Sequence, residues 1–194
     1  MNPDPKLTTW LELELPEIEA VLTGDLRRHV AALSIDKIDF YGYAVLAEDY
    51  RTITYDDPPS IAVAFNCESD ISDPNVGDIY YRYSVDEWEN YVHQGFDNTN
   101  SSLRCLYTKF LKLFYNDPDD PQCDANRGAF FDRLHRSYLD SLKLTRADDT
   151  FGRNVFLVIW ISDSSYKIMG DSARSLNLPD IYNLYASEFE QDGK

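Results

Sequence analysis

Basic residues are scarce in this chain. Its 194 residues include 18 lysines and arginines against 34 aspartates and glutamates, so the formal net charge at pH 7 is −16. Proteins that bind nucleic acids replace phosphate counterions with lysine and arginine. Proteins that bind anionic bilayers use clusters of the same two residues. We therefore expect neither a nucleic acid nor a membrane as partner.

Long apolar runs and a disulfide framework are also missing. The longest apolar run covers residues 155–161, whereas a membrane-spanning helix needs about 20 such residues. The opening residues, MNPDPKLTTW, do not have the pattern of a secretory signal. Cys67, Cys105 and Cys123 are odd in number and widely spaced, which predicts free thiols. Together these features predict a cytoplasmic protein.

Sequence motifs for catalysis and phosphate binding are absent. The eight glycines form no G-x-S-x-G, G-x-x-x-x-G-K-[ST] or G-x-G-x-x-G pattern, and no H-E-x-x-H occurs. One acidic loop, residues 117–124, is a candidate for calcium. Counting from Asp117, however, Gln122 and Gly128 stand where an EF-hand needs glycine and glutamate. We therefore predict no cofactor, no metal and no catalytic residue.

Strand-like and helix-like patterns are both present. Aromatic, β-branched or alternating apolar residues predict strands at residues 39–47, 51–55, 61–67, 79–83 and 154–162. Helical spacing of apolar residues begins at Pro16, recurs over residues 103–114 and 130–142, and returns after Pro179. Ser84 to Glu87 has the S-x-x-E pattern of a capping box, which predicts a further helix there.

These elements do not alternate regularly, so the predicted fold class is α+β rather than doubly wound α/β. We predict a single α+β domain over residues 1–194, with helices packed on a mixed or antiparallel sheet of about five strands. Residues 1–15 precede the first helical pattern and are expected to form a loosely held N-terminal arm. The apolar run in residues 154–162 is expected to be a central strand that pairs with the early strands.

Acidic residues concentrate in the first half of the chain. Residues 1–100 contain 20 acidic and six basic residues, a net charge of −14, whereas residues 101–194 carry −2. Complementary charge accelerates protein association, and tyrosine is frequent at interface hot spots. The residues predicted to contact a basic protein partner are Tyr55, Asp56, Asp57, Glu68, Asp70, Asp73, Asp78 and Tyr80. A role in solubility alone is the other explanation of this charge.

Arg82 is isolated among these carboxylates, within the run Tyr80-Tyr81-Arg82-Tyr83. One interpretation is a buried or half-buried ion pair with a neighbouring acid. The other is an arginine that binds a ligand in a cleft between sheet and helices. In that case the protein would be an enzyme or a sensor of a small molecule.

Four segments resemble a bacterial family catalogued as domain of unknown function 4303. DFYGYAVLAEDY (39–50) is similar to its "YGYAL"-type first strand, and IYYRYSVDEWENY (79–91) to its "Y-R-W-S-P-x-E-W" segment. Tyr83 and Val85 depart from that pattern, where tryptophan and proline are usual. FGRNVFLVIWISD (151–163) and SARSLNLPDIYNLYASEF (172–189) resemble its closing strand, Leu-Asn segment and final helix.

The resemblance implies a bacterial cytoplasmic α+β protein without an established catalytic activity. Small acidic proteins of such families are often encoded beside contact-delivered toxins, which they neutralise as immunity proteins. With the charge distribution, this association predicts an immunity protein that binds a cognate basic toxin domain. A structural or regulatory subunit of a larger assembly is a further alternative, and the homo-oligomeric state is left open.

Overall fold

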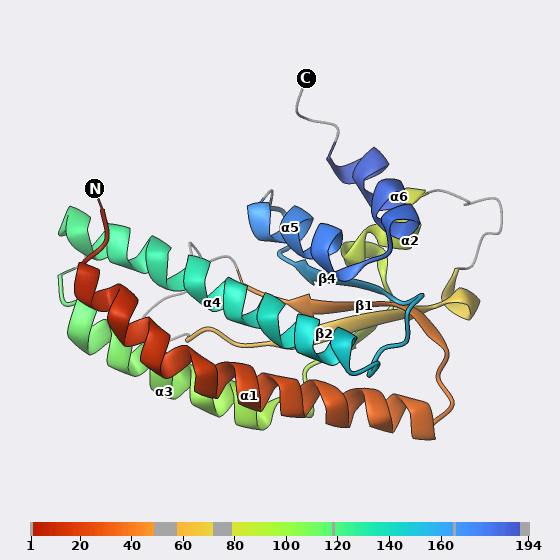
Figure 1. The fold of residues 1–194 in the computed structure, drawn as a ribbon, viewed down its shortest axis with the longest axis horizontal. Coiled ribbons are helices and arrows are strands. Elements are labelled where there is room, and N and C mark those ends of the chain that lie inside the picture. The colour runs from red at the N-terminus through yellow and green to blue at the C-terminus, as the bar shows by residue number, and fades with distance from the viewer. Residues whose placement is uncertain (1, 49–57, 72–78, 118, 165, 191–194) are drawn as a thin grey trace.

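Helices and a mixed sheet build this fold (Figure 1). The computed structural model describes residues 2–48, 58–71, 79–117, 119–164 and 166–190. The helices are α1 (Pro5–Ile35), α2 (Ile79–Tyr83), α3 (Asp97–Phe114), α4 (Pro121–Ala147), α5 (Lys167–Leu176) and α6 (Pro179–Phe189). The strands are β1 (Phe40–Leu46), β2 (Ala62–Cys67), β3 (Asn90–Val92) and β4 (Phe156–Trp160). The α+β class is thus confirmed, with four strands in the described sheet rather than about five.

The strands lie in the order β3-β2-β1-β4. β1 pairs antiparallel with β2 and parallel with β4, and β2 pairs antiparallel with β3. The predicted pairing of the late apolar strand with an early one is therefore confirmed. Its predicted central position is wrong, because β4 follows β1 at one end of this order. The strand predicted at residues 51–55 lies outside the described residues.

β4 is fully buried, although among the described residues it has a strand neighbour, β1, on one side only. The segment from α5 to Asn177 covers its other side. The Asn177 side chain accepts a hydrogen bond from Leu157 N at 2.8 Å and donates one to Leu157 O at 2.7 Å. Ser172 Oγ accepts another from Ile159 N at 2.9 Å. Side chains thus satisfy backbone groups that a further strand would otherwise pair.

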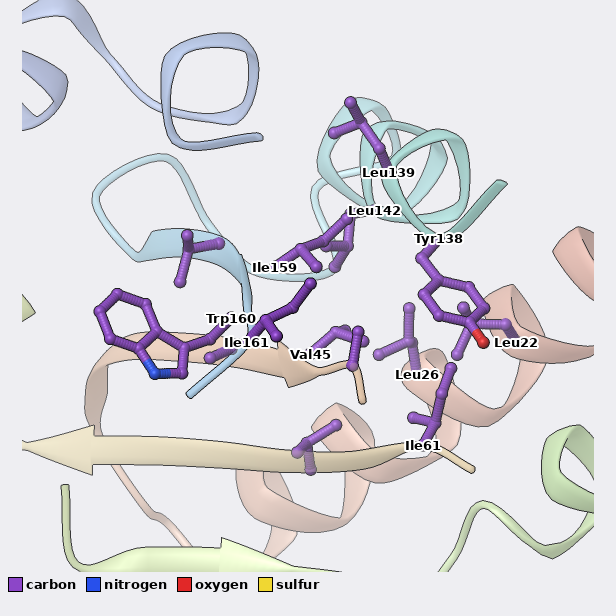
Figure 2. Packing of buried hydrophobic residues seen from close by; sticks show 14 of the residues in the cluster. Leu22, Leu26, Val45, Ile61, Tyr138, Leu139, Leu142, Ile159, Trp160 and Ile161 are labelled. Atoms are coloured by element: carbon purple, nitrogen blue, oxygen red, sulfur yellow. The ribbon is translucent and has the colours of Figure 1, made fainter. Parts of the chain in front are cut away.

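Three long helices, α1, α3 and α4, cover one face of the sheet (Figure 1). Val45 of β1 and Ile159 of β4 are register partners, and both point toward this layer. Figure 2 shows them between Leu26 of α1 and Leu142 of α4, all of which are buried. This face forms part of one hydrophobic core that includes residues from all six helices.

The first helix is longer than the sequence pattern predicted. It begins at Pro5 rather than Pro16, with Asp4 as its N-cap accepting a hydrogen bond from Lys6 N at 2.8 Å. Residues 5–15 are therefore helical rather than a loosely held arm, and Leu7, Leu11 and Leu15 are buried. Proline inside a helix removes one backbone donor. Burial of leucines against α3 and α4 outweighs that local cost at Pro16.

The segment from α2 to Trp88, together with α6, covers the opposite face of the sheet. Residues 79–83, predicted as a strand, are helical, and Tyr83 packs on Phe156 with ring centroids 4.8 Å apart. The helix predicted after Ser84 is only a 3-10 turn, because the chain becomes extended at Trp88. There the buried indole lies against Gly42 of β1. Tertiary packing of two aromatic residues thus overrides local sequence preference.

Candidate functional site

Five of the eight residues predicted to contact a partner lie outside the described residues: Tyr55, Asp56, Asp57, Asp73 and Asp78. The other three do not form one group. Glu68 and Asp70 lie in the 3-10 turn that follows β2, whereas Tyr80 lies in α2 against Phe189 of α6. The prediction of a common acidic face therefore stays a prediction for the residues as a set.

Asp70 has a structural role at the end of β2. Its Oδ2 atom accepts hydrogen bonds from Cys67 N at 3.1 Å and from Asn90 Nδ2 at 2.8 Å, which ties β2 to β3. Burial, followed by the charges of Asp70 and Asp39, raises the pKa of the Cys67 thiol to about 11. The thiol is consequently protonated at neutral pH and is a poor nucleophile.

Arg82 is engaged within the protein. Its guanidinium pairs with Glu68, with Nη1 3.1 Å from Oε2, and lies 4.3 Å from the centroid of the Tyr41 ring. The hydrogen bond from Arg82 lowers the pKa of Glu68. The ion-pair interpretation of Arg82 is confirmed. Glu68, predicted as a partner-binding residue, uses its carboxylate in this pair.

A cleft of about 570 Å³ opens where β4 ends, between α2, α5 and α6. Its size lies within the range of about 300–1,000 Å³ that is usual for ligand sites. Five aromatic residues line it: Tyr80, Trp160, Tyr166, Tyr185 and Phe189. Its acidic lining residues are Asp86, Asp163, Asp171 and Glu190, and its basic ones are Lys167 and Arg174. Neither Arg82 nor a histidine is among the lining residues, so this is not the cleft around Arg82 that the sequence suggested.

Two of the acidic residues in the cleft neutralise its two bases. Lys167 Nζ lies 3.6 Å from Asp171 Oδ2, one helical turn away on α5. Arg174 donates to Tyr182 Oη at 2.9 Å and to Glu190 Oε2 at 3.3 Å, and the Tyr182 hydroxyl donates to the same Glu190 atom at 2.7 Å. The charges of Asp86 and Asp163 are therefore left unbalanced.

Asp86 is held at the rim of the cleft by residues at the end of β4. Its Oδ1 atom accepts hydrogen bonds from Trp160 Nε1 at 3.0 Å and from Ser162 Oγ at 2.5 Å. Its Oδ2 atom accepts none from the described residues. Asp163 makes no hydrogen bond with the described part of the chain and has a left-handed backbone, φ 53°. Both carboxylates are exposed at the surface.

Next to the cleft, the segment from α2 to β3 exposes tyrosines among acids. The exposed fractions are 38% for Tyr80, 47% for Tyr81 and 42% for Tyr91. Partial burial, then the charges of Asp86 and Glu87, raise the pKa of Tyr91, so these groups are neighbours. We name the tyrosine–acid surface for its six residues, Tyr80, Tyr81, Asp86, Glu87, Glu89 and Tyr91. The sequence predicted only Tyr80 among them, because the acids were interpreted as the first turn of a helix.

The comparison with protein families supports the resemblance seen in the sequence as far as residue 178, whereas the part that concerned the final helix, residues 179–189, lies beyond the match. The sequence pattern of the family described as Domain of unknown function (DUF4303) matches residues 22–178, more than half of the chain. The chain belongs to this family. No curated protein and no solved structure matches it. The region matched by the DUF4303 pattern contains all four strands and the tyrosine–acid surface. It ends before α6, so Tyr185, Phe189 and Glu190 of the cleft lie beyond the family match.

The DUF4303 chain shows neither a metal-binding cluster nor a membrane-spanning helix among its described residues. Across the residues that the structure describes, no three histidine, cysteine, aspartate or glutamate residues are grouped as metal ligands would be. No helix in the same residues has the length and apolar character needed to cross a bilayer.

Proposed function

We propose that this protein is a cytoplasmic immunity protein of a bacterium, which binds a basic toxin domain and blocks it by occupying its surface. The observation that carries the proposal is the tyrosine–acid surface. It presents three exposed tyrosines and three exposed carboxylates on a segment of 12 residues, Tyr80 to Tyr91. The only base of that segment, Arg82, is paired with Glu68 outside it.

The physical argument has two parts. A net charge of −16 attracts a basic partner from a distance, which raises the association rate. Exposed tyrosines then provide contact area with little loss of side-chain freedom, and they rank among the residues that contribute most to binding energy. Exposed acids alone would raise the association rate but would not slow dissociation, because charges at the rim of an interface affect the association rate more than the dissociation rate.

The competing function, an enzyme or small-molecule sensor built around Arg82, has less support. The guanidinium that would bind the ligand is already paired with Glu68 and stacked on Tyr41. The cleft itself has the volume of a ligand site, which keeps a small-molecule ligand as the second candidate.

A first experiment identifies the partner. The reading frame directly upstream of this one should encode a large secreted protein with a variable C-terminal domain. Expression of that domain alone should stop growth, and co-expression of this protein should restore it. Continued arrest, or an upstream domain with no effect on growth, would contradict the proposed function.

A second experiment tests the surface. Reversing two charges with Glu87→Lys and Glu89→Lys should lower the association rate constant about tenfold, measured by stopped flow. The matched control is Glu12→Lys with Glu17→Lys, which makes the same charge change at exposed positions of α1. Equal effects of the two pairs would show that total charge, rather than this surface, guides the partner.

A further inference from the structure

We propose that the cleft at the end of β4 is a binding site for an arginine side chain of the basic partner. The guanidinium would lie between the Asp86 and Asp163 carboxylates, against the exposed ring of Tyr80 and next to the indole N–H of Trp160. This inference rests on the proposed function and deepens it, because it assigns the partner's anchoring residue.

Charge is the first support. The two bases that line the cleft are each paired with a carboxylate of the same lining, Lys167 with Asp171 and Arg174 with Glu190. Asp86 and Asp163 therefore give the cleft an unbalanced charge, and Asp86 Oδ2 makes no hydrogen bond with the described residues. A cation entering here meets two acceptors that no cation of the described chain neutralises.

The aromatic lining is the second support. The Trp160 and Phe189 rings meet edge to face at 5.9 Å and 89°, and Tyr80 stacks on Phe189 at 5.9 Å. Ring faces attract cations, and arginine stacks on them more often than lysine does. Packed rings beside carboxylates that pair with no base of the described residues are the chemistry that recognises a guanidinium.

The protein also uses this combination for two of its own arginines. Arg82 lies over the Tyr41 ring at 4.3 Å and pairs with Glu68. Arg174 lies 5.3 Å from the Tyr182 centroid and pairs with Glu190. Each arginine has one tyrosine ring and one carboxylate. The cleft lining includes the same two kinds of group, the Tyr80 ring and the Asp86 carboxylate, and the cleft volume of about 570 Å³ is larger than a single side chain.

A titration of the isolated protein tests the chemistry of the cleft. The probe is Nα-acetyl-arginine methylamide, and its neutral counterpart is Nα-acetyl-citrulline methylamide, which has the same shape without the charge. The readout is the indole N–H resonance of Trp160 in ¹H–¹⁵N spectra, with Trp10 and Trp88 as internal references. We expect a saturable shift of the Trp160 signal with the arginine compound and at least a fivefold weaker effect with the citrulline compound.

Substitutions then locate the site. Asp86→Asn and Asp163→Asn each remove one charge and should weaken binding about fivefold or more. Both should fold, because Asn retains the Oδ1 acceptor at position 86 and tolerates left-handed backbone at position 163. Asp180→Asn is the matched control, since Asp180 is an exposed acid at the start of α6 that does not line the cleft. This control should leave the affinity for the arginine compound within about twofold of the wild-type value.

Three results would overturn the inference. The first is an equal response to the arginine and citrulline compounds. The second is no saturable shift of Trp160 with either compound. The third is a saturable response to inorganic phosphate in place of arginine, which would make the cleft an anion site around Lys167 and Arg174.

The inference and the proposed function can fail separately. A cognate toxin domain that binds Asp86→Asn and Asp163→Asn as tightly as the wild type would overturn the arginine site and leave the immunity function intact. A saturable arginine titration without any toxin partner would support the site and contradict the function.

Discussion

At the scale of single residues, Gly42 sets how closely the α2–Trp88 segment lies on the sheet. A Cβ atom at this position would lie 2.7 Å from two atoms of the Trp88 indole. The indole is buried, and its Nε1 donates to Arg82 O at 3.2 Å, so it has little room to move. Any side chain at position 42 would push outward the segment that contains the tyrosine–acid surface.

Gly42→Ala should therefore destabilise the protein by about 1–3 kcal/mol, because the indole or the strand must shift. Gly128→Ala is the matched control. Gly128 lies inside α4, and a Cβ there meets nothing within 4 Å, so alanine should stabilise the helix by about 0.5–1 kcal/mol. Urea unfolding followed by circular dichroism measures both. Effects of the same sign at the two positions would show that close packing on Trp88 is not what position 42 requires.

Single residues whose role depends on distant partners could not be predicted from the sequence. Asp25 is fully buried in α1, where it accepts hydrogen bonds from Thr99 N at 3.0 Å and Thr99 Oγ1 at 2.7 Å. It thereby caps the first turn of α3, 74 residues away along the chain. The pairing of Asp86 with Trp160 is equally distant in sequence. Neither pair has a spacing that a reader of the sequence could recognise.

At the scale of elements, β4 and the Leu-Asn segment form one unit. Asn177 follows α5 and makes three hydrogen bonds, two to the backbone of Leu157 and one to Ala173 O at 2.8 Å. The amide side chain has one acceptor and two donor hydrogens, so it matches a strand's exposed N–H and C=O together. Because Asn177 satisfies these backbone groups, β4 can be buried along its whole length although β1 is its only partner strand among the described residues.

Asn177→Ala should cost about 2–3 kcal/mol in unfolding free energy, because it leaves buried backbone groups of β4 without partners. It should also accelerate hydrogen exchange at the Leu157 amide, the group that Asn177 accepts from. Asn154→Ala makes the same change at an exposed position just before β4 and should cost less than about 0.5 kcal/mol. Unchanged exchange at Leu157 would contradict a covering role for Asn177.

Most elements with a strong repeating pattern could be predicted. The strands at 39–47, 61–67 and 154–162 and the helical patterns at 103–114, 130–142 and after Pro179 are confirmed as β1, β2, β4, α3, α4 and α6. The secondary structure of residues 79–88 could not be predicted. Their apolar side chains alternate as in a strand, but in the structure they belong to a short helix and a 3-10 turn that pack on the sheet. The predicted start of α1 was wrong, because the proline at position 16 was interpreted as the first residue of the helix.

At the scale of the whole molecule, charge acts on stability and on binding in opposite directions. A net charge of −16 disfavours the compact state through repulsion among like charges, and it favours encounter with a basic partner. Local ion pairs such as Arg27–Asp148 and Lys109–Glu14 relieve only part of this repulsion, because exposed pairs contribute little each. Salt screens both the repulsion and the attraction.

Raising sodium chloride from about 20 mM to about 300 mM shortens the Debye length from about 20 Å to about 6 Å. We expect the urea midpoint of unfolding to rise over this range and the association rate with the proposed toxin partner to fall, about tenfold or more. Choline chloride should have the same effects, since screening depends on ionic strength rather than on the cation. A rate that falls while the midpoint stays constant would mean that repulsion is already balanced within the fold. The acids of the tyrosine–acid surface would then attract a partner without lowering the stability of the protein that presents them.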